Sequence, residues 1–207
     1  MSGQRTAEWF ARRAGKFTGS RFADLMAVTK SGPSASRRNL LATLAVERIT
    51  GACVETYSNA AMQRGIELEE EARQAYEAHA GTLCVEIDFI DHPNVPMVGV
   101  SPDGLVGDDG LVEIKCQASM AKHLDAIRTG AHAAEYRWQI QGQLWVTGRQ
   151  WCDAVSYDPR FPQRLQLAVT RVMRDDDAIA QLAAAVGEAE VEVARIVAEL
   201  TENGGAS

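Results

Sequence analysis

The segment around a glycine-rich turn, Gly107-Asp108-Asp109-Gly110, constrains the fold more than any other part of the sequence. Apolar stretches flank this turn on both sides, a pattern typical of two paired strands. A chain that folds back here brings Asp103 beside Glu113. Because side chains alternate along a strand, Glu113 and Lys115 share one face while Ile114 points into the core.

Two carboxylates and a lysine at one point can bind a hard divalent metal and act on a nearby water. Pro102 stiffens the approach to Asp103, and Gly104 releases the backbone just after it. The alternative is a solvated strand face, since Asp followed by Glu-x-Lys occurs by chance in acidic proteins. The residues favour a metal-dependent site for phosphodiester cleavage.

The composition indicates one globular domain with a sizeable core, because 46% of the 207 residues are apolar and 24% are charged. No apolar run approaches a membrane span and no secretory signal opens the chain, so we expect a cytoplasmic protein without a membrane partner. The four cysteines contain no Cys-x-x-Cys pair. This spacing excludes a zinc ribbon and a disulfide framework as the organising feature.

Charge is unevenly distributed along the chain. The net charge is −7, yet residues 1–38 hold eight basic and two acidic residues, which gives +6 there and −13 in the remainder. A basic N-terminal part on an acidic body can contact phosphates beside a carboxylate site. A solvated basic helix is the alternative explanation.

Periodicity predicts helices that alternate with strands. We expect helices at Ala7–Ala14, Arg21–Val28 (capped by Thr18-Gly19-Ser20), Asn39–Ile49, Asn59–Ala80 with a possible break at Gly65, Ser119–Arg128, Glu135–Val146 and Asp175–Leu200. We expect strands at Leu83–Ile90, Met97–Val100 leading to Asp103, Leu111–Cys116, Gln150–Tyr157 and Leu165–Val172. This order predicts an α/β fold with a mixed sheet flanked by helices.

The predicted domain spans residues 1–202, with a basic helical part (1–50), a catalytic core (51–172) and a C-terminal helix (173–202). Residues 203–207 are expected to form a flexible tail. Within the core, Glu69 and Glu71 border opposite edges of the apolar face of the helix at Asn59–Ala80, and periodicity does not choose between them as site residues.

Several motifs occur in a fixed order along the chain: Arg12-Arg13-Ala14-Gly15 with Thr18-Gly19-Ser20, Gly65 through Arg73, Ser101 through Lys115, Gln139-Ile140-Gln141, and Tyr157-Asp158-Pro159-Arg160. Together they resemble the lambda-type alkaline exonuclease (YqaJ-like) family of the PD-(D/E)XK nuclease superfamily. The resemblance runs from about Trp9 to about Pro162 and implies a restriction-endonuclease-like fold.

The resemblance also implies residue roles. Asp103, Glu113, Lys115 and Glu69 match catalytic positions. Mg²⁺ (or Mn²⁺) would be held by Asp103, Glu113 and the Ile114 carbonyl, while Glu69 would share a second ion with Asp103 or act only through water. Lys115 would orient and deprotonate the attacking water. Residues that match the 5′-phosphate pocket are Arg13 and Ser20 and, more loosely, Ser101 and Gln139. Residues that match DNA-contacting positions are Lys30, Met62 (a wedge between strands) and Arg12.

The activity implied by the resemblance is 5′-to-3′ digestion of one strand of linear double-stranded DNA that carries a 5′-phosphate. The products would be 5′-mononucleotides and a 3′ single-stranded overhang for phage-type recombination. A homotrimeric ring and a single-strand annealing protein are the expected partners, in a phage or prophage protein of a bacterial host.

Three alternatives remain open at this point. A structure- or sequence-specific endonuclease of the same superfamily would use the same carboxylates and lysine. A non-catalytic DNA-binding module would contain a decayed site. An acidic interaction protein would account for the C-terminal helix but not for the ordered motifs.

Overall fold

The computed structural model describes residues 6–30, 32–54 and 60–203, without the side chains of Ala61, Met62 and Asn203. The N-terminal half contains α1 (Ala7–Arg13), β1 (Phe17–Thr18), the 3-10 helix η1 (Gly19–Arg21), α2 (Phe22–Met26), β2 (Val28–Thr29), β3 (Gly32–Pro33), α3 (Ala35–Thr50) and α4 (Ala60–Ala80). The remainder contains β4 (Cys84–Val85), β5 (Ile90–Asp91), β6 (Val98–Val100), β7 (Gly104–Val106), β8 (Gly110–Cys116), α5 (Met120–Thr129), α6 (His132–Glu135), α7 (Arg137–Thr147), β9 (Trp151–Tyr157), η2 (Gln163–Leu165), β10 (Leu167–Met173) and α8 (Asp176–Asn203).

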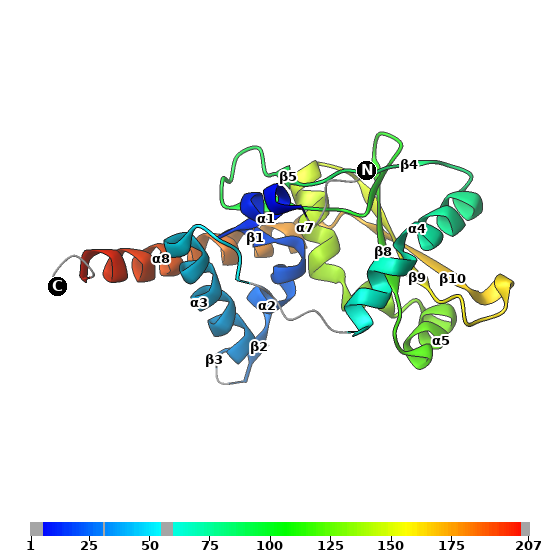
Figure 1. The fold of residues 1–207 in the computed structure, drawn as a ribbon, viewed down its shortest axis with the longest axis horizontal. Coiled ribbons are helices and arrows are strands. Elements are labelled where there is room, and N and C mark those ends of the chain that lie inside the picture. Colours follow the sequence, from blue (N-terminus) through cyan, green and yellow to red (C-terminus); the bar gives the residue numbers. More distant parts are fainter. Residues whose placement is uncertain (1–5, 31, 55–59, 204–207) are drawn as a thin grey trace.

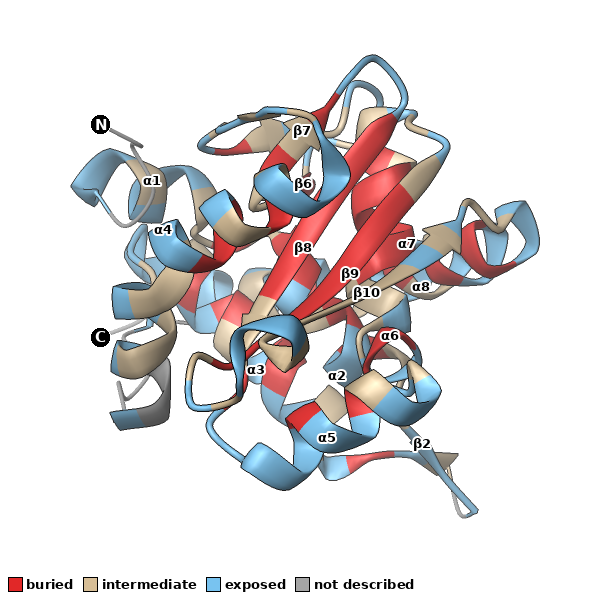
Figure 2. Cartoon of the chain, turned by 90° about the vertical axis from the view of Figure 1, so that its right-hand side faces the viewer, coloured by how far each residue is buried: buried red, intermediate tan, exposed pale blue. Residues whose placement is uncertain are grey.

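A five-stranded mixed sheet in the order β10-β9-β8-β7-β4 forms the centre of the fold (Figure 1). Strands β8 and β9 pair in parallel, and the other neighbours pair antiparallel. Both central strands are buried, as Figure 2 shows, because helices cover the two faces of the sheet. The predicted mixed sheet with flanking helices is confirmed.

Alternating residues of β8 supply the two faces of the sheet. Val112 and Ile114 pack with Ala72 and Tyr76 of α4 in one apolar cluster. Leu111 packs on the opposite side, in the cluster that includes residues of α6, α7 and β9. Glu113 follows the same alternation and therefore points toward α7.

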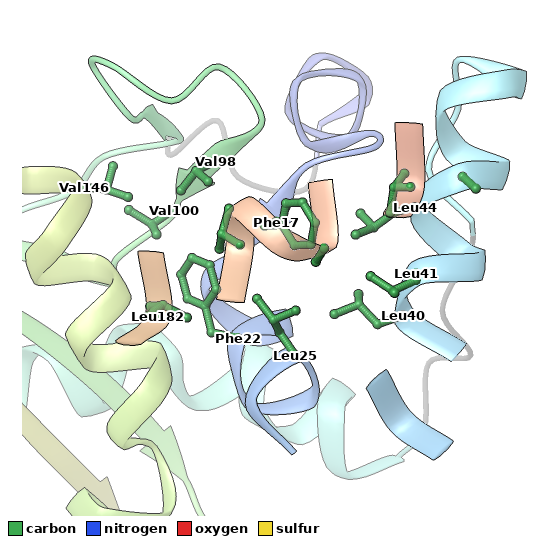
Figure 3. Packing of buried hydrophobic residues seen from close by; sticks show 14 residues of the cluster. Phe17, Phe22, Leu25, Leu40, Leu41, Leu44, Val98, Val100, Val146 and Leu182 are labelled. Atoms are coloured by element: carbon green, nitrogen blue, oxygen red, sulfur yellow. The ribbon is translucent and has the colours of Figure 1, made fainter. Parts of the chain in front are cut away.

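A separate apolar cluster joins the N-terminal helices to α7 and α8 (Figure 3). Phe22 of α2 is fully buried there, next to Gly142 of α7. A methyl group at Gly142 would lie 2.1 Å from a ring carbon of Phe22, so only glycine allows this approach. The contact fixes α2 and the adjoining η1 against α7.

The long helix α8 lies along α3 and extends to one end of the molecule (Figure 1). Ion pairs Arg37–Glu192 (2.7 Å) and Arg48–Glu190 (2.6 Å) accompany the apolar contact between them. Asn203 belongs to this helix, so the tail does not begin there as predicted. No helix of the described chain is both long enough and apolar enough to span a membrane.

Several local predictions were wrong. The strand expected at Leu83–Ile90 consists of two short strands in different sheets, because β4 pairs with β7 and β5 pairs with β6. The strand at Val98–Val100 pairs with β1 and β5 and does not continue to Asp103. Pro102, which has no amide hydrogen, lies between that strand and β7.

The helix boundaries also differ in places. Ser20 lies inside η1 and does not cap a helix; the cap residues Thr18 and Arg21 make no side-chain capping bond. Helix α3 begins earlier than predicted because the Ser34 hydroxyl accepts the Arg37 amide at 3.1 Å. Helix α4 continues through Gly65, whose cost in a helix interior is only about 1 kcal/mol.

Candidate active site

The β7–β8 hairpin places the two predicted carboxylates, Asp103 and Glu113, opposite each other. Gly104 pairs with Val112, so Asp103 and Glu113 occupy the next pair along the ladder. Gly107 adopts φ 52° in the turn, a conformation that glycine accommodates best. The Asp103 Oδ2 atom accepts a 2.6 Å hydrogen bond from the Ile114 amide. The turn therefore produces the expected proximity.

Glu113 is almost fully buried and accepts hydrogen bonds from three side chains. Lys115 Nζ lies 2.5 Å from Oε1, and Gln139 Nε2 donates to the same oxygen. Gln143 Nε2 donates to Oε2 at 2.6 Å. Lys115 Nζ also lies 4.8 Å from the ring centroid of Tyr136, within the range of a cation–π contact. The carboxylate is thus held by both β8 and α7.

The charges at the site are strongly coupled. Burial and repulsion by Glu113 raise the pKa of Asp103 well above its usual value. Burial alone would lower the pKa of Lys115, but attraction to Glu113 and Asp103 raises it overall. Lys115 is therefore an ammonium group at neutral pH, poised to donate hydrogen bonds.

The carboxylates of α4 take different positions. Glu69 is half-buried and adds to the repulsion that raises the pKa of Asp103. Glu71 instead accepts a 2.6 Å hydrogen bond from the Tyr157 hydroxyl. The structure thus distinguishes the two glutamates that periodicity left equivalent, and Glu69 is the one whose charge acts on the Asp103 site.

The donor set fits a hard divalent cation. Asp103 and Glu113 offer carboxylate oxygens, and a cation between them would offset the repulsion that raises the Asp103 pKa. Among the described residues, no three His, Cys, Asp or Glu side chains are grouped closely enough to hold a metal. The fit of the site to a cation therefore rests on the Asp103–Glu113 pair. Glu69 does not complete a three-residue metal-binding group with them.

A second polar region lies beside α1. The Arg13 guanidinium stacks on Trp9 at 4.0 Å from the ring centroid and donates to the Thr18 hydroxyl at 3.2 Å. Burial and the nearby Arg21 charge lower the pKa of Arg13 to about 10. The Trp9 indole donates to Ser101 at 3.0 Å, so one ring connects Arg13 with Ser101.

Arg13 and Ser20 line the same cavity of about 620 Å³, together with residues of α1, α2 and α3. The neighbouring Gly19 faces the side chains of Gln139 and Gln143. The structure thus brings the predicted phosphate-pocket residues together and places them next to the carboxylate site through α7.

The predicted DNA-contacting residues lie farther apart. Arg12 forms a 2.8 Å ion pair with Asp91 at the surface. Lys30 is exposed between β2 and β3. The Met62 side chain lies outside the part of the chain that the structure describes.

Sequence reasoning did not assign a role to Gln143 or Tyr136, both of which contact the Glu113–Lys115 pair. Gln143 is fully buried, and its Oε1 atom has no hydrogen-bond partner among the described residues. Its spacing of four from Gln139 was the available signal, since these positions share one helix face. Tyr136, which precedes α7, gave no comparable signal.

Comparison with known structures defines the class of protein. An alkaline exonuclease from Laribacter hongkongensis is 46% identical, with a TM-score of 0.88 over 97% of this chain and 98% of that chain. The same enzyme in complex with dAMP gives 46% identity and a TM-score of 0.88, with 98% and 100% of the two chains covered. A phage-related exonuclease from Haemophilus somnus is 16% identical (TM-score 0.75; 89% and 96% covered) and shares the fold. The fold is that of the alkaline and phage-related exonucleases.

The family is also defined by sequence. The model of the YqaJ-like viral recombinase domain matches residues 8–150, which is more than half of the chain. The chain therefore belongs to the YqaJ-like viral recombinase family, and the resemblance to lambda-type alkaline exonucleases is confirmed. A search of curated proteins found no match.

Proposed function

We propose that this protein is a metal-dependent 5′-to-3′ exonuclease of the PD-(D/E)XK type that digests one strand of linear double-stranded DNA. The products are 5′-mononucleotides and a 3′ single-stranded overhang. The observation that supports this most strongly is the pair formed by Asp103 and the buried Glu113, held with Lys115 beside the Arg13–Ser20 cavity. Family membership and the dAMP complex of the Laribacter enzyme, in which a mononucleotide is bound, agree with it.

Asp103, Glu113 and the Ile114 carbonyl would hold Mg²⁺ or Mn²⁺, with Glu69 contributing directly or through water. The bound ion would polarise the phosphoryl group and stabilise its negative charge. Lys115 orients the attacking water, and Gln139 and Gln143 keep Glu113 in place. Water attacks phosphorus in line with the 3′-oxygen, and the bond to that oxygen breaks. The released nucleotide leaves with a protonated 3′-hydroxyl, and the attacked phosphate stays as the new 5′-phosphate of the shortened strand.

The raised pKa of Lys115 determines when this residue can act as a base. The ammonium form donates hydrogen bonds and cannot accept a proton from water. The carboxylates of Glu113 and Asp103 are what raise its pKa, so neutralising their charge would lower it again. Lys115 would therefore accept a proton from water only when a bound cation offsets the charges of Glu113 and Asp103.

Raising the pH should increase cleavage when Mg²⁺ is limiting. The ionised form of Asp103 is the form that binds a cation, and its raised pKa means that it gains a proton as the pH falls. We expect kcat/KM at low Mg²⁺ to rise with pH, because more Asp103 is ionised at higher pH, with a limiting slope of about one. A flat profile under these conditions would contradict the assignment of Asp103 as a metal ligand.

Arg13 is proposed to recognise the terminal 5′-phosphate, with Ser20, Ser101 and Gln139. We expect Arg13→Gln to reduce the preference for 5′-phosphorylated over unphosphorylated linear duplex by about tenfold or more, because a charge-assisted hydrogen bond is lost. Initial rates on the two duplexes measure this preference. Arg37→Gln is the control, since Arg37 is similarly shielded but pairs with Glu192 between α3 and α8.

Closed circular DNA distinguishes the competing functions in the same assay. An end-dependent exonuclease leaves it intact, whereas an endonuclease of the same superfamily cuts it. A DNA-binding module without catalysis binds the linear duplex but releases no nucleotides.

We further propose a homotrimeric ring, a single-strand annealing partner and a phage or prophage origin in the bacterial cytoplasm, with Lys30, Met62 and Arg12 contacting DNA. Light scattering that shows a monomer would reject the ring.

A further inference from the structure

The segment Tyr157-Asp158-Pro159-Arg160, in which β9 ends and a turn begins, contains a fully buried carboxylate, that of Asp158. Asp158 Oδ1 accepts hydrogen bonds from the Arg160 amide (3.1 Å) and Nε (2.8 Å), and Oδ2 accepts from Arg160 Nη2 (2.6 Å). Arg64 of α4 donates to Oδ1 at 3.2 Å. Although burial raises it, these arginine bonds and charges lower the pKa of Asp158 overall, so the carboxylate is ionised.

The same two arginines bind the backbone just after the β8 strand that contains Lys115. Arg64 Nη1 donates to the Gln117 carbonyl at 3.4 Å, and Arg160 Nη2 donates to it at 3.2 Å. Arg160 Nη2 also reaches the Ala118 carbonyl at 3.0 Å. Asp158 therefore connects three segments: α4, the end of β8 and the turn after β9.

A second connection holds α4 against the same end of β9. The Tyr157 hydroxyl donates to Glu71 at 2.6 Å, while Arg64 reaches Asp158 from an earlier turn of the helix. Glu69 lies between Arg64 and Glu71 along α4, and its charge already acts on Asp103. The helix turn that bears Glu69 is thus fixed on both sides.

We propose that Asp158 is a positioning residue for the cation site. Through Arg64 and Arg160 it sets the position of Glu69 relative to Asp103 and Lys115, and so it sets the affinity of the site for a divalent cation. This inference rests on the proposed function, because it takes Asp103 as a ligand of the cation and Glu69 as a carboxylate whose charge acts on the same site. Asp158 touches neither the reacting atoms nor the cation.

Asp153, at the other end of β9, provides a matched control. It is also buried, accepts 2.8 Å bonds from both Arg171 Nε and Nη2, and accepts a 2.8 Å bond from Tyr76 of α4. It therefore connects α4 to a neighbouring strand through an arginine, as Asp158 connects it to the end of β8. None of its hydrogen bonds in the described chain goes to the segment after Lys115.

The test compares Asp158→Asn with Asp153→Asn in the full-length protein. Mn²⁺ binding is measured by titration calorimetry without DNA, and kcat and KM are measured with 5′-phosphorylated linear duplex. We expect Asp158→Asn to weaken Mn²⁺ binding by about tenfold and to lower kcat by about tenfold, with KM for DNA nearly unchanged. Losses of this size are typical when a residue that orients metal ligands is replaced. Asp153→Asn should lower the melting temperature but leave Mn²⁺ affinity and kcat at wild-type levels.

Wild-type Mn²⁺ affinity in a folded Asp158→Asn protein would overturn the inference, as would an equal loss of affinity in Asp153→Asn. If circular dichroism shows that Asp158→Asn does not fold, Arg64→Gln replaces it. That variant removes only the hydrogen bonds from Arg64 of α4 to Asp158 and the Gln117 carbonyl. It should also weaken Mn²⁺ binding, and unchanged binding would overturn the inference. A wild-type protein that binds Mn²⁺ but cleaves no DNA rejects the proposed function, while the calorimetry still decides the role of Asp158.

Discussion

Lys115→Ala should lower the rate of cleavage by about 100-fold or more while leaving the fold intact. The substitution removes the only side-chain ammonium that the described structure places on Glu113, and it leaves Asp103 and Glu113 to repel each other without compensation. In the proposed mechanism, the attacking water would also lose the donor that orients it. Single-turnover rates on a 5′-phosphorylated linear duplex measure the effect.

The control for this prediction is Lys122→Ala. Lys122 is exposed at the start of α5 and pairs with Glu135 at 2.7 Å, away from the carboxylates. The Lys122→Ala protein should cleave DNA at the wild-type rate. Normal turnover by a folded Lys115→Ala protein would remove Lys115 from the mechanism.

Asp103→Asn should abolish detectable cleavage and yet stabilise the protein in metal-free buffer. Because the Asp103 pKa is raised in the folded state, this carboxyl lowers stability progressively as the pH rises from its unfolded-state pKa toward its folded-state pKa. Asparagine keeps an oxygen that accepts the Ile114 amide but bears no charge. We expect a rise in melting temperature of about 2–4 °C at neutral pH and a loss of rate of about 100-fold or more.

The control is Asp109→Asn, in the exposed turn of the same hairpin. It should change neither the melting temperature nor the cleavage rate. The two measurements on Asp103→Asn are separate: calorimetric melting tests the electrostatic strain, and the nuclease assay tests the role in catalysis. A lower melting temperature for a folded Asp103→Asn protein would show that the Asp103 carboxylate is not under repulsion.

The part of the site that could be predicted from sequence is the part formed by local chain folding. A glycine-rich turn fixes the register of its two strands, so Asp103 and Glu113 could be paired without knowledge of the rest of the fold. The i, i+4 spacing of Gln139 and Gln143 likewise indicated a shared face. Whether that face is buried on Glu113 depends on how α7 packs, and the local sequence contains no signal for this.

Features that depend on distant partners were not predictable in this way. The strand at Val98–Val100 pairs with Phe17–Thr18 from far earlier in the chain, so alternation showed a strand but not its sheet. The choice between Glu69 and Glu71 similarly depended on Tyr157, which comes from β9. Arg13 and Ser101 are connected by the ring of Trp9, a relation that only the folded structure makes visible.

The close contact between Phe22 and Gly142 has a consequence for how much DNA is removed at a time. It locks the pocket proposed for the chain end to the helix that holds Glu113, so the span between the captured terminus and the scissile bond is constant. Under the proposed function, the length removed in each step would therefore be set by helix packing and would not depend on base sequence.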